Sequence, residues 1–286
     1  MNEDLIIFIF SHGRPEKIHT IKTLLKNGYT GKYFIIIDDE DQTAHKYYEL
    51  FSDKVIMFNK SEAAKLFDAG DNFTDRRAIV YARNASYNIA KKLGYKYFLQ
   101  FEDDYIDFYF KINAKGEYAQ KKINNLDFIL NCLLNYYKTI PAKCVSMQQG
   151  GDFFGGKKSS NITNENRARN IMRKTMNSLF CSVDRPVKWI GRLNDDVNTY
   201  VEAGRRGDIF LNTSMLALQQ PVTQKVAGGH SEIYKSMGTF VKSFYSIMYA
   251  PSCVSIAMLN SSHSRLHHQV SYNHAVPCII QQKWKK

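Results

Sequence analysis

The sequence has no apolar run close to the roughly 20 residues that a membrane-spanning helix needs. Its N-terminal apolar run, Leu5–Phe10, is far shorter. Two acidic residues, Glu3 and Asp4, precede this run where a secretory signal would carry positive charge, and no small-residue cleavage site follows it. We therefore expect a buried first strand at Leu5–Phe10 and no association with a membrane.

Closely spaced cysteines are also absent, although the chain contains five. No two of them form a C-x-x-C motif, and an odd number of dispersed cysteines in 286 residues argues against structural zinc. Such cysteine usage is typical of a reducing compartment, so we expect a cytoplasmic protein. The five are Cys132, Cys144, Cys181, Cys253 and Cys278.

Acidic residues are scarce in the second half of the chain. Residues 1–140 contain 20 Lys and Arg against 19 Asp and Glu, whereas residues 141–286 contain 19 against 8. The formal net charge of +12 therefore lies almost entirely in the second half. This asymmetry favours binding of a polyanion such as nucleic acid, because each phosphate contact releases counterions. A basic surface that serves only solubility is the alternative.

Short apolar segments in the first half alternate with helical patterns and predict an α/β fold. Continuous apolar strands separated by helices favour a mainly parallel sheet that is covered by helices on both faces. Gly28 and Gly94 follow two of the helical patterns and mark their ends. The expected strands are Leu5–Phe10, Tyr33–Ile37, Lys54–Phe58 and Tyr97–Phe101, and the expected helices are Glu16–Asn27, Ala44–Phe51 and Arg76–Leu93.

The pattern becomes looser after Asp107. No internal repeat and no low-complexity linker divides the chain, so we expect one compact domain with a decorated second half. An aromatic helix and a histidine-rich tail follow Ala227. The other expected elements are helices at Ile123–Thr139 and within Ile190–Gly207, strands at Cys144–Met147 and Phe210–Leu218, and a polar loop at Lys157–Asn170.

Three acidic residues, Glu102, Asp103 and Asp104, follow the strand Tyr97–Phe101 directly. Side chains at positions i and i+2 of a strand end point to the same side, so Glu102 and Asp104 can face one cation. Carboxylates suit hard divalent ions such as Mg²⁺ and Mn²⁺, with substrate phosphates completing the coordination. Ligands bind beyond the carboxyl ends of parallel strands, so this position favours a metal site over a solvated acidic turn.

Other polar residues lie at the ends of the first two predicted strands or in the helix before the acidic motif. Asp38 and Asp39 end the second strand, where a carboxylate can bind a ribose hydroxyl or a base N–H, although a surface acidic turn is the alternative. The turn after the first strand contains Ser11 and Arg14, which are suited to an anionic ligand at a helix start. Arg83 lies within the helix before the acidic motif and would pair with a diphosphate or orient the carboxylates, unless it is an exposed helical arginine.

Together these motifs resemble nucleotide-diphosphate-sugar glycosyltransferases of the GT-A fold. The shared order is a strand with a Ser/Gly/Arg turn, a strand ending in Asp-Asp, a helix with Ala82-Arg83-Asn84, and a strand ending in Glu-Asp-Asp. The resemblance implies that Glu102 and Asp104 bind Mn²⁺ or Mg²⁺ together with the diphosphate of a UDP-sugar, with Glu in place of the usual first Asp. The residues expected to bind the sugar nucleotide are Ser11, Arg14, Asp38, Asp39, Arg83 and Asp103.

A second acidic motif, Gly191-Arg192-Leu193-Asn194-Asp195-Asp196, precedes a helical pattern and resembles the later motif of the same family. In inverting members its second acid is the general base, which implies Asp196 in that role, with Asp195 as the second choice. An Asp that caps the following helix is the alternative. The family often adds a late histidine to the metal site, for which His263 is our choice.

The acceptor is predicted from charge. The compact chain and its basic second half resemble bacteriophage enzymes that glycosylate hydroxymethylated pyrimidines in DNA, which implies hydroxymethylcytosine or hydroxymethyluracil in double-stranded DNA as acceptor. The aromatics Phe153 and Phe154 would stack on an extruded base, or pack within the protein. If the protein is phage-encoded, its cytoplasm is that of the host. The basic residues concerned include Lys157, Lys158, Arg167, Arg169, Arg173, Lys174, Arg205 and Arg206.

We accordingly assign residues 1–140 to sugar-nucleotide binding and residues 141–286 to acceptor binding and catalysis within the same compact domain. Two other functions fit parts of the pattern. A glycosyltransferase that acts on a polysaccharide or protein would use the basic charge for an acidic glycan. A metal-dependent nuclease would use Glu102, Asp104 and the pair Asp195 and Asp196 as a two-metal site.

Overall fold

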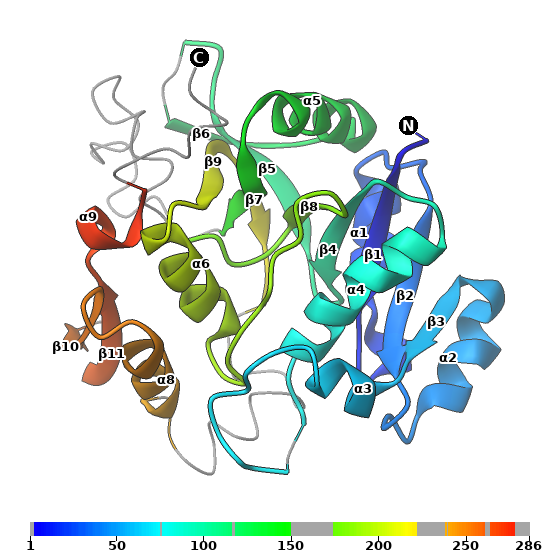
Figure 1. Cartoon of the computed structure of the whole chain (residues 1–286). Coiled ribbons are helices and arrows are strands. Elements are labelled where there is room, and N and C mark those ends of the chain that lie inside the picture. The colour runs from blue at the N-terminus through cyan, green and yellow to red at the C-terminus, as the bar shows by residue number, and fades with distance from the viewer. Residues whose placement is uncertain are drawn as a thin grey trace.

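The computed structural model describes residues 3–74, 76–115, 118–149, 174–221, 238, 240–260 and 264–277. A nine-stranded sheet with the order β3-β2-β1-β4-β8-β7-β9-β5-β6 forms its centre (Figure 1). The first four of these strands are parallel to one another. They are β1 (Leu5–Phe10), β2 (Tyr33–Asp38), β3 (Val55–Phe58) and β4 (Tyr97–Glu102).

The remaining five strands make the sheet mixed. β7 is parallel to β9, whereas β8 runs antiparallel to both β4 and β7, and β5 runs antiparallel to β6 and β9. The bounds are β5 (Asp107–Ile112), β6 (Tyr118–Lys122), β7 (Ala142–Gln149), β8 (Leu179–Ser182) and β9 (Ile209–Gln219). The predicted α/β class is thus confirmed. The four strands β3, β2, β1 and β4 form a continuous parallel part, and β7 and β9 form a separate parallel pair. The strands β5, β6 and β8 were not predicted.

The alternation of side chains in β1 explains its continuous apolar sequence. Leu5, Ile7 and Ile9 pack into one hydrophobic cluster, with residues of α1, α2 and α5. The even-numbered residues of β1 pack into a second cluster on the other face, with residues of α3, α4 and α6. Because helices cover both faces, no position of β1 can be polar, and all six are buried.

Helix bounds differ from the predicted ones mainly at the N-terminal ends. The expected helix Glu16–Asn27 is a 3-10 turn at Pro15–Lys17 followed by α1 (His19–Lys26), and the expected Arg76–Leu93 starts later, as α4 (Val80–Lys92). The other helices of this domain are α2 (Ala44–Phe51), α3 (Lys60–Ala64), α5 (Leu126–Thr139) and α6 (Asp195–Arg205), and a second 3-10 turn spans Ser52–Lys54.

The last part of the described chain packs beside α6 (Figure 1). It comprises α8 (Val241–Tyr249), the antiparallel pair β10 (Val254–Asn260) and β11 (Ser264–Val270), and α9 (Tyr272–Ala275). The aromatic helix was predicted, whereas the strand β11, which lies in the histidine-rich tail, was not. No helix among the described residues is long and apolar enough to span a bilayer.

The register of the parallel strands brings three strand ends together. Phe10, the last residue of β1, lies between Ile36 of β2 and Glu102 of β4. The residues that follow these positions therefore meet at one edge of the sheet. This edge holds the Ser11–Arg14 turn, Asp38 and the Glu102–Asp104 motif.

Two helix-ending glycines provide a matched test of the packing. Gly28 and Gly94 both have φ of +80°, but a Cβ on Gly28 would lie 2.6 Å from the carbonyl oxygen of Asn124, whereas a Cβ on Gly94 would have nothing within 4 Å. Left-handed backbone costs an alanine about 1–2 kcal/mol. We expect Gly94→Ala to lower the free energy of unfolding by about that amount and Gly28→Ala by clearly more, measured by urea denaturation followed by circular dichroism. Equal losses would contradict the close approach at Gly28.

Candidate active site

The turn after β1 is bound to the acidic motif after β4. The Ser11 hydroxyl donates to Asp103 Oδ2 at 2.6 Å, and Arg14 reaches the same carboxylate with Nε at 2.9 Å and Nη2 at 2.7 Å. Asp103 is completely buried, and burial raises its pKa although Arg14 and Ser11 oppose the shift. The Tyr47 hydroxyl contacts Ser11 Oγ at 2.8 Å. Ser11, Arg14 and Asp103 therefore hold one another, which fixes the turn relative to β4.

The end of β2 carries a second buried ion pair. The Lys60 ammonium lies 3.1 Å from Asp38 Oδ1, and Lys60 is only 3% exposed. His12 Nδ1 lies 2.8 Å from the other oxygen of Asp38. Burial opposes ionisation of Asp38, but His12 and Lys60 outweigh it and lower its pKa. Asp39 has a different role, because it accepts hydrogen bonds from the backbone N–H of Lys60 at 2.8 Å and from Asn59 Nδ2 at 2.7 Å at the start of α3.

The carboxylates of Glu102 and Asp104 converge on one point. Gln220 Nε2 donates to Glu102 Oε2 at 2.9 Å and to Asp104 Oδ1 at 3.0 Å. Asn177 orients this amide by donating to Gln220 Oε1 at 2.6 Å. Burial and the charge of Asp104 raise the pKa of Glu102 to about 7, although Arg83 opposes the shift. The prediction that positions i and i+2 face the same side thus holds for this pair.

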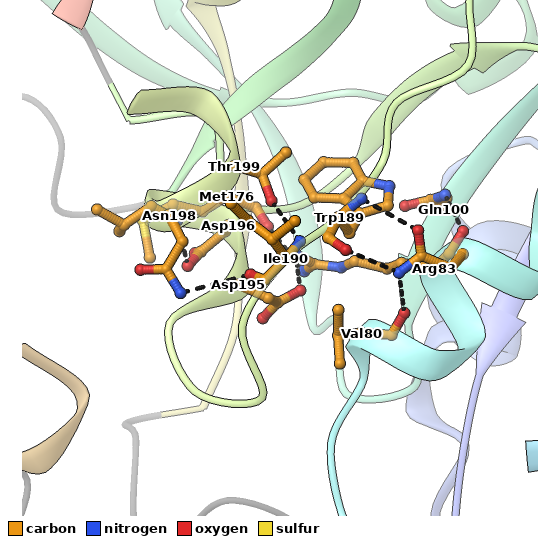
Figure 2. A network of polar contacts seen from close by, with 12 residues as sticks. Val80, Arg83, Gln100, Met176, Trp189, Ile190, Asp195, Asp196, Asn198 and Thr199 are labelled. Atoms are coloured by element: carbon orange, nitrogen blue, oxygen red, sulfur yellow. Dashed lines mark hydrogen bonds and ion pairs between the residues drawn. The ribbon is translucent and has the colours of Figure 1, made fainter. Parts of the chain in front are cut away.

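Arg83 of α4 connects this strand end to the second acidic motif. Its Nη1 lies 2.9 Å from Asp195 Oδ2, and its Nη2 lies 3.0 Å from the carbonyl oxygen of Met176 and 3.5 Å from Glu102 Oε1. The guanidinium also lies over the ring of Trp189, 5.1 Å from its centroid. Figure 2 shows Arg83 pointing between Trp189 and Asp195. The Arg83 side chain is only 4% exposed, so the alternative of an exposed helical arginine is wrong.

Polar neighbours on α4 and β4 hold the helix that carries Arg83. The side-chain amide of Asn84 accepts a hydrogen bond from the backbone N–H of Trp189 at 3.0 Å and donates one to the carbonyl oxygen of Trp189 at 3.0 Å. Both backbone groups of Trp189 are thus paired with one side chain. Gln100 Nε2 donates to the carbonyl oxygen of Arg83 at 3.1 Å and to Ser86 Oγ at 2.9 Å. These contacts, drawn as dashed lines in Figure 2, link α4 to β4 and to the segment before α6.

Asp195 and Asp196 begin α6 but have different surroundings. Asp195 is buried against Arg83, and burial together with the charge of Asp196 raises its pKa while Arg83 opposes the shift. Asp196 is half-buried, and its Oδ1 accepts from the N–H of Val197 at 2.7 Å. The residue that caps α6 is Asn194, in left-handed backbone with φ of 60° and without a side-chain cap bond. Neither Asp195 nor Asp196 is therefore the N-cap residue of α6, which was the alternative to a catalytic role.

The structure brings most of the predicted site residues together and adds contacts from residues that the sequence did not indicate. Asp38, Arg83, Glu102, Asp103 and Asp104 share the edge of the sheet, and Asp195 joins them through Arg83. His263 lies outside the described residues, as do Phe153, Phe154, Lys157 and Lys158. Four participants were missed: Lys60, Asn177, Trp189 and Gln220. Only Trp189 has a sequence signal, since it lies two residues before Gly191 of the second acidic motif.

Glu102 and Asp104 are a pair rather than a complete cage of ligands. Within the described ranges no group of three or more His, Cys, Asp or Glu side chains is placed to hold a metal ion. Mg²⁺ is commonly bound by one or two carboxylates together with water and substrate phosphates, so a two-carboxylate site suits an ion that arrives with its substrate.

Comparison with solved structures gives low similarity. Glucosyl-3-phosphoglycerate synthase from Mycobacterium tuberculosis, in complex with Mn²⁺, UDP and phosphoglyceric acid, is 8% identical with a TM-score of 0.45, and the match covers 93% of this chain and 86% of that chain. The same enzyme with Mn²⁺ and UDP-glucose is 7% identical with a TM-score of 0.47 and coverages of 93% and 86%. At TM-scores below 0.5 these likenesses carry no argument about this chain.

No curated protein sequence matches the chain. The model of one protein family, the TET-associated glycosyltransferases, matches residues 5–229. This match includes both acidic motifs, the Ser11–Arg14 turn and Arg83, and it extends over well more than half of the 286 residues. The predicted enzyme class is therefore confirmed, and the chain belongs to the TET-associated glycosyltransferase family.

Proposed function

We propose that this glycosyltransferase uses a divalent metal ion to move a sugar from a UDP-sugar to the hydroxymethyl group of a modified pyrimidine in DNA. The observation that carries the proposal is the convergence of Glu102 and Asp104 on one nitrogen, 2.9 and 3.0 Å away, with Asp195 and Asp196 nearby through Arg83. This proximity supports a single site that combines the residues expected to bind the metal and donor with the expected general base.

The donor set fits Mn²⁺ or Mg²⁺. Two carboxylates that share one hydrogen-bond donor repel each other, and the raised pKa of Glu102 reflects this repulsion and its burial. A divalent cation in place of the Gln220 N–H groups would stabilise both carboxylates. When bound, the ion would neutralise the charge that develops on the UDP leaving group.

The chain's own residues would shape the nucleotide part of the site. Arg14 and Asp103 neutralise each other, so their main role would be to hold the turn after β1 in place and not to bind the diphosphate by themselves. Asp38 keeps its charge through Lys60 and His12 and lies at the end of β2, the position expected for contact with a ribose or base.

Asp196 is the proposed general base. Asp195 is paired with the buried Arg83, whereas Asp196 is half-buried and its Oδ1 accepts a hydrogen bond from the N–H of Val197 in its own helix. Its carboxylate would take the proton of the acceptor hydroxyl while that oxygen forms a bond to the anomeric carbon and the bond from this carbon to UDP breaks. This displacement inverts the configuration at the anomeric carbon.

The proposed DNA acceptor is supported by the charge distribution of the chain and by its family. Most of the net charge of +12 belongs to residues 141–286, which suits a phosphodiester polymer, and the TET association in the family description agrees with a modified pyrimidine. A polysaccharide or protein acceptor is the second candidate, supported by the same basic charge if the glycan is acidic. The cytoplasmic location remains a prediction from the cysteine pattern.

Asp104→Asn tests the metal site. Loss of one carboxylate removes much of the ion's several kcal/mol of transition-state stabilisation, so we expect transfer to fall by at least about 100-fold and the Mn²⁺ concentration for half activity to rise. Asp53→Asn, an exposed aspartate in the turn before β3, is the matched control and should behave as wild type. Normal turnover of Asp104→Asn would end the metal assignment.

Asp195→Ala and Asp196→Ala separate a positioning role from a catalytic one. Removing Asp195 leaves the buried guanidinium of Arg83 without its partner, so we expect a loss of about 3–5 kcal/mol in the free energy of unfolding. Asp196→Ala should change stability by less than about 1 kcal/mol but lower kcat by about 10²–10⁴-fold. Unfolding by urea and steady-state kinetics measure the two effects. An Asp196→Ala enzyme with unchanged kcat would remove it as the base.

The acceptor is tested by nucleoside mass spectrometry on hydroxymethylated and unmodified DNA incubated with enzyme, Mn²⁺ and pooled UDP-sugars. We expect a mass gain of one sugar on the hydroxymethylated nucleoside only, with release of UDP in the same reaction. UDP release that depends on an added glycan or protein instead of DNA would reject the DNA acceptor while keeping the glycosyltransferase. Nicking of the DNA without any sugar nucleotide would support the nuclease alternative.

A further inference from the structure

The turn after β1 carries a histidine, His12, at the edge of the sheet that holds the candidate active site. Its neighbour Ser11 donates to Asp103 of the acidic motif after β4. β1 lies between β4 and β2, as Figure 1 shows, and neighbouring strands are about 4.8 Å apart, so the ends of β4 and β2 are separated by about 10 Å. An extended nucleoside diphosphate has a comparable length from its β-phosphate to its base. A donor whose diphosphate lies at Glu102 and Asp104 can therefore reach the end of β2 with its base.

Asp38, the residue expected to contact the base or ribose at that end, already has partners within the protein. Its Oδ1 accepts from Lys60 Nζ at 3.1 Å and from the backbone N–H of Glu40 at 3.2 Å. Its Oδ2 lies 2.8 Å from Nδ1 of His12. The Asp38 side chain is only 6% exposed, so little of the carboxylate is left for a ligand. Asp38 is therefore suited to act through its partners and not by direct contact.

Of the other aspartates near this turn, two hold it in place. Asp41 is buried and accepts from the backbone N–H of Gly13 at 2.7 Å, and Asp103 is completely buried by the contacts described above. Asp39 is exposed, although each of its oxygens already accepts a hydrogen bond from the start of α3. The turn therefore presents His12 to a ligand, with Asp39 as the competing group.

The Asp38 carboxylate determines which ring nitrogen of His12 carries the proton. Burial opposes ionisation of Asp38, but His12 and Lys60 outweigh it and lower its pKa, so the carboxylate is ionised at neutral pH. An ionised carboxylate only accepts hydrogen bonds, so Nδ1 must be the donor in the 2.8 Å contact. In the neutral imidazole the proton is then on Nδ1, and Nε2 is left as an acceptor.

A ligand can reach this other ring nitrogen. The His12 side chain is 35% exposed, and the polar contacts of its ring found in the described part of the chain, with Asp38 at 2.8 Å and Asp41 at 3.8 Å, both involve Nδ1. A Cβ built on Gly13, the next residue, would meet no atom of the described residues within 4 Å. The imidazole is thus held through one nitrogen while the other is left for a ligand.

An acceptor at this position distinguishes nucleobases by their ring nitrogens. Uracil presents N3–H, and thymine and guanine present an equivalent ring N–H, whereas cytosine and adenine present a lone pair there. A lone pair opposite Nε2 would leave both acceptors without a donor, which is costly once water is excluded. A site built around such a hydrogen bond therefore rejects an analogue that lacks the donor.

We propose that His12 accepts a hydrogen bond from uracil N3–H through Nε2 and thereby selects a uridine nucleotide over a cytidine nucleotide. This inference deepens the proposed function and rests on it for the UDP-sugar donor. Asp38 and Lys60 are positioning residues, because Lys60 pairs with Asp38 and Asp38 fixes the proton of His12. The hydrogen bond from Gly13 to Asp41 holds the turn that presents the ring.

The first measurement determines the proton position in the free enzyme and needs no reaction. Two-bond ¹H–¹⁵N spectra of enzyme labelled with ¹⁵N-histidine are recorded at pH 8, and the signals of His12 are identified by their absence in His12→Asn. We expect a protonated Nδ1 and an unprotonated Nε2, and UDP with Mg²⁺ should shift the Nε2 signal. A proton on Nε2 in the free enzyme would overturn the proposal, as would an Nε2 signal that UDP leaves unchanged.

The second measurement compares UDP, CDP and 3-methyl-UDP, in which a methyl group replaces the N3 proton, by titration calorimetry with Mg²⁺. We expect wild-type enzyme to bind UDP at least about fivefold more tightly than either analogue. In His12→Asn the amide N–H can keep the bond to Asp38 while no atom replaces Nε2, so UDP binding should weaken to the level of the analogues. His274→Asn, at an exposed histidine of α9, is the matched control and should bind as wild type.

The other outcomes separate this inference from its rivals and from the proposed function. If the difference between UDP and 3-methyl-UDP persists in His12→Asn, the proposal is rejected, and loss of that difference in Asp39→Ala would assign N3–H to Asp39 instead. Equal binding of UDP and 3-methyl-UDP by the wild-type enzyme, together with sugar transfer to DNA, would keep the proposed function and reject the role of His12. UDP binding that depends on N3–H and on His12, without transfer to DNA, would keep this role and reject the DNA acceptor.

Discussion

The buried contact between Arg83 and Asp195 is the interaction on which the site depends. A guanidinium that is almost fully removed from water must have partners, because an unpaired buried charge is far more costly than a paired one. Arg83 finds them on the start of α6, on the Met176 segment and on β4, at distances between 2.9 and 3.5 Å. Elements that are more than ninety residues apart in the chain are thereby fixed around one side chain.

The same contact gives two adjacent acids different properties. Asp195 is buried and neutralised by Arg83, whereas Asp196 is partly accessible and its charge acts on Lys242 of α8. Neighbouring carboxylates in unlike environments are a common way to divide structural and chemical roles. At the other end of Arg83, Glu102 and Asp104 repel each other and are held together by Gln220. Arg83 thus lies between the two acids proposed to bind a metal ion and the acid proposed to accept a proton.

Much of the first half of the fold could be predicted from local sequence. A strand that is buried on both faces, such as β1, must be apolar throughout, and glycine with positive φ marks the ends of α1 and α4. The antiparallel strands could not be predicted in this way. β8 has four residues and pairs with β4 residues that lie 79 to 85 positions earlier in the chain, so its existence depends on a long-range partner and not on its own pattern. β11, in the histidine-rich tail, was not predicted for the same reason.

For the site, the sequence by itself determined which acids lie at strand and helix starts or ends, because strand period and helix signals are local properties. Tertiary structure alone decided their partners. Lys60 meets Asp38, Arg14 meets Asp103, and Gln220 meets Glu102 from 118 positions away. A carboxylate in a motif has the same local sequence whether it binds a ligand, holds a turn or neutralises a buried arginine. Its surroundings, and through them its charge and pKa, are set by residues that only folding brings near.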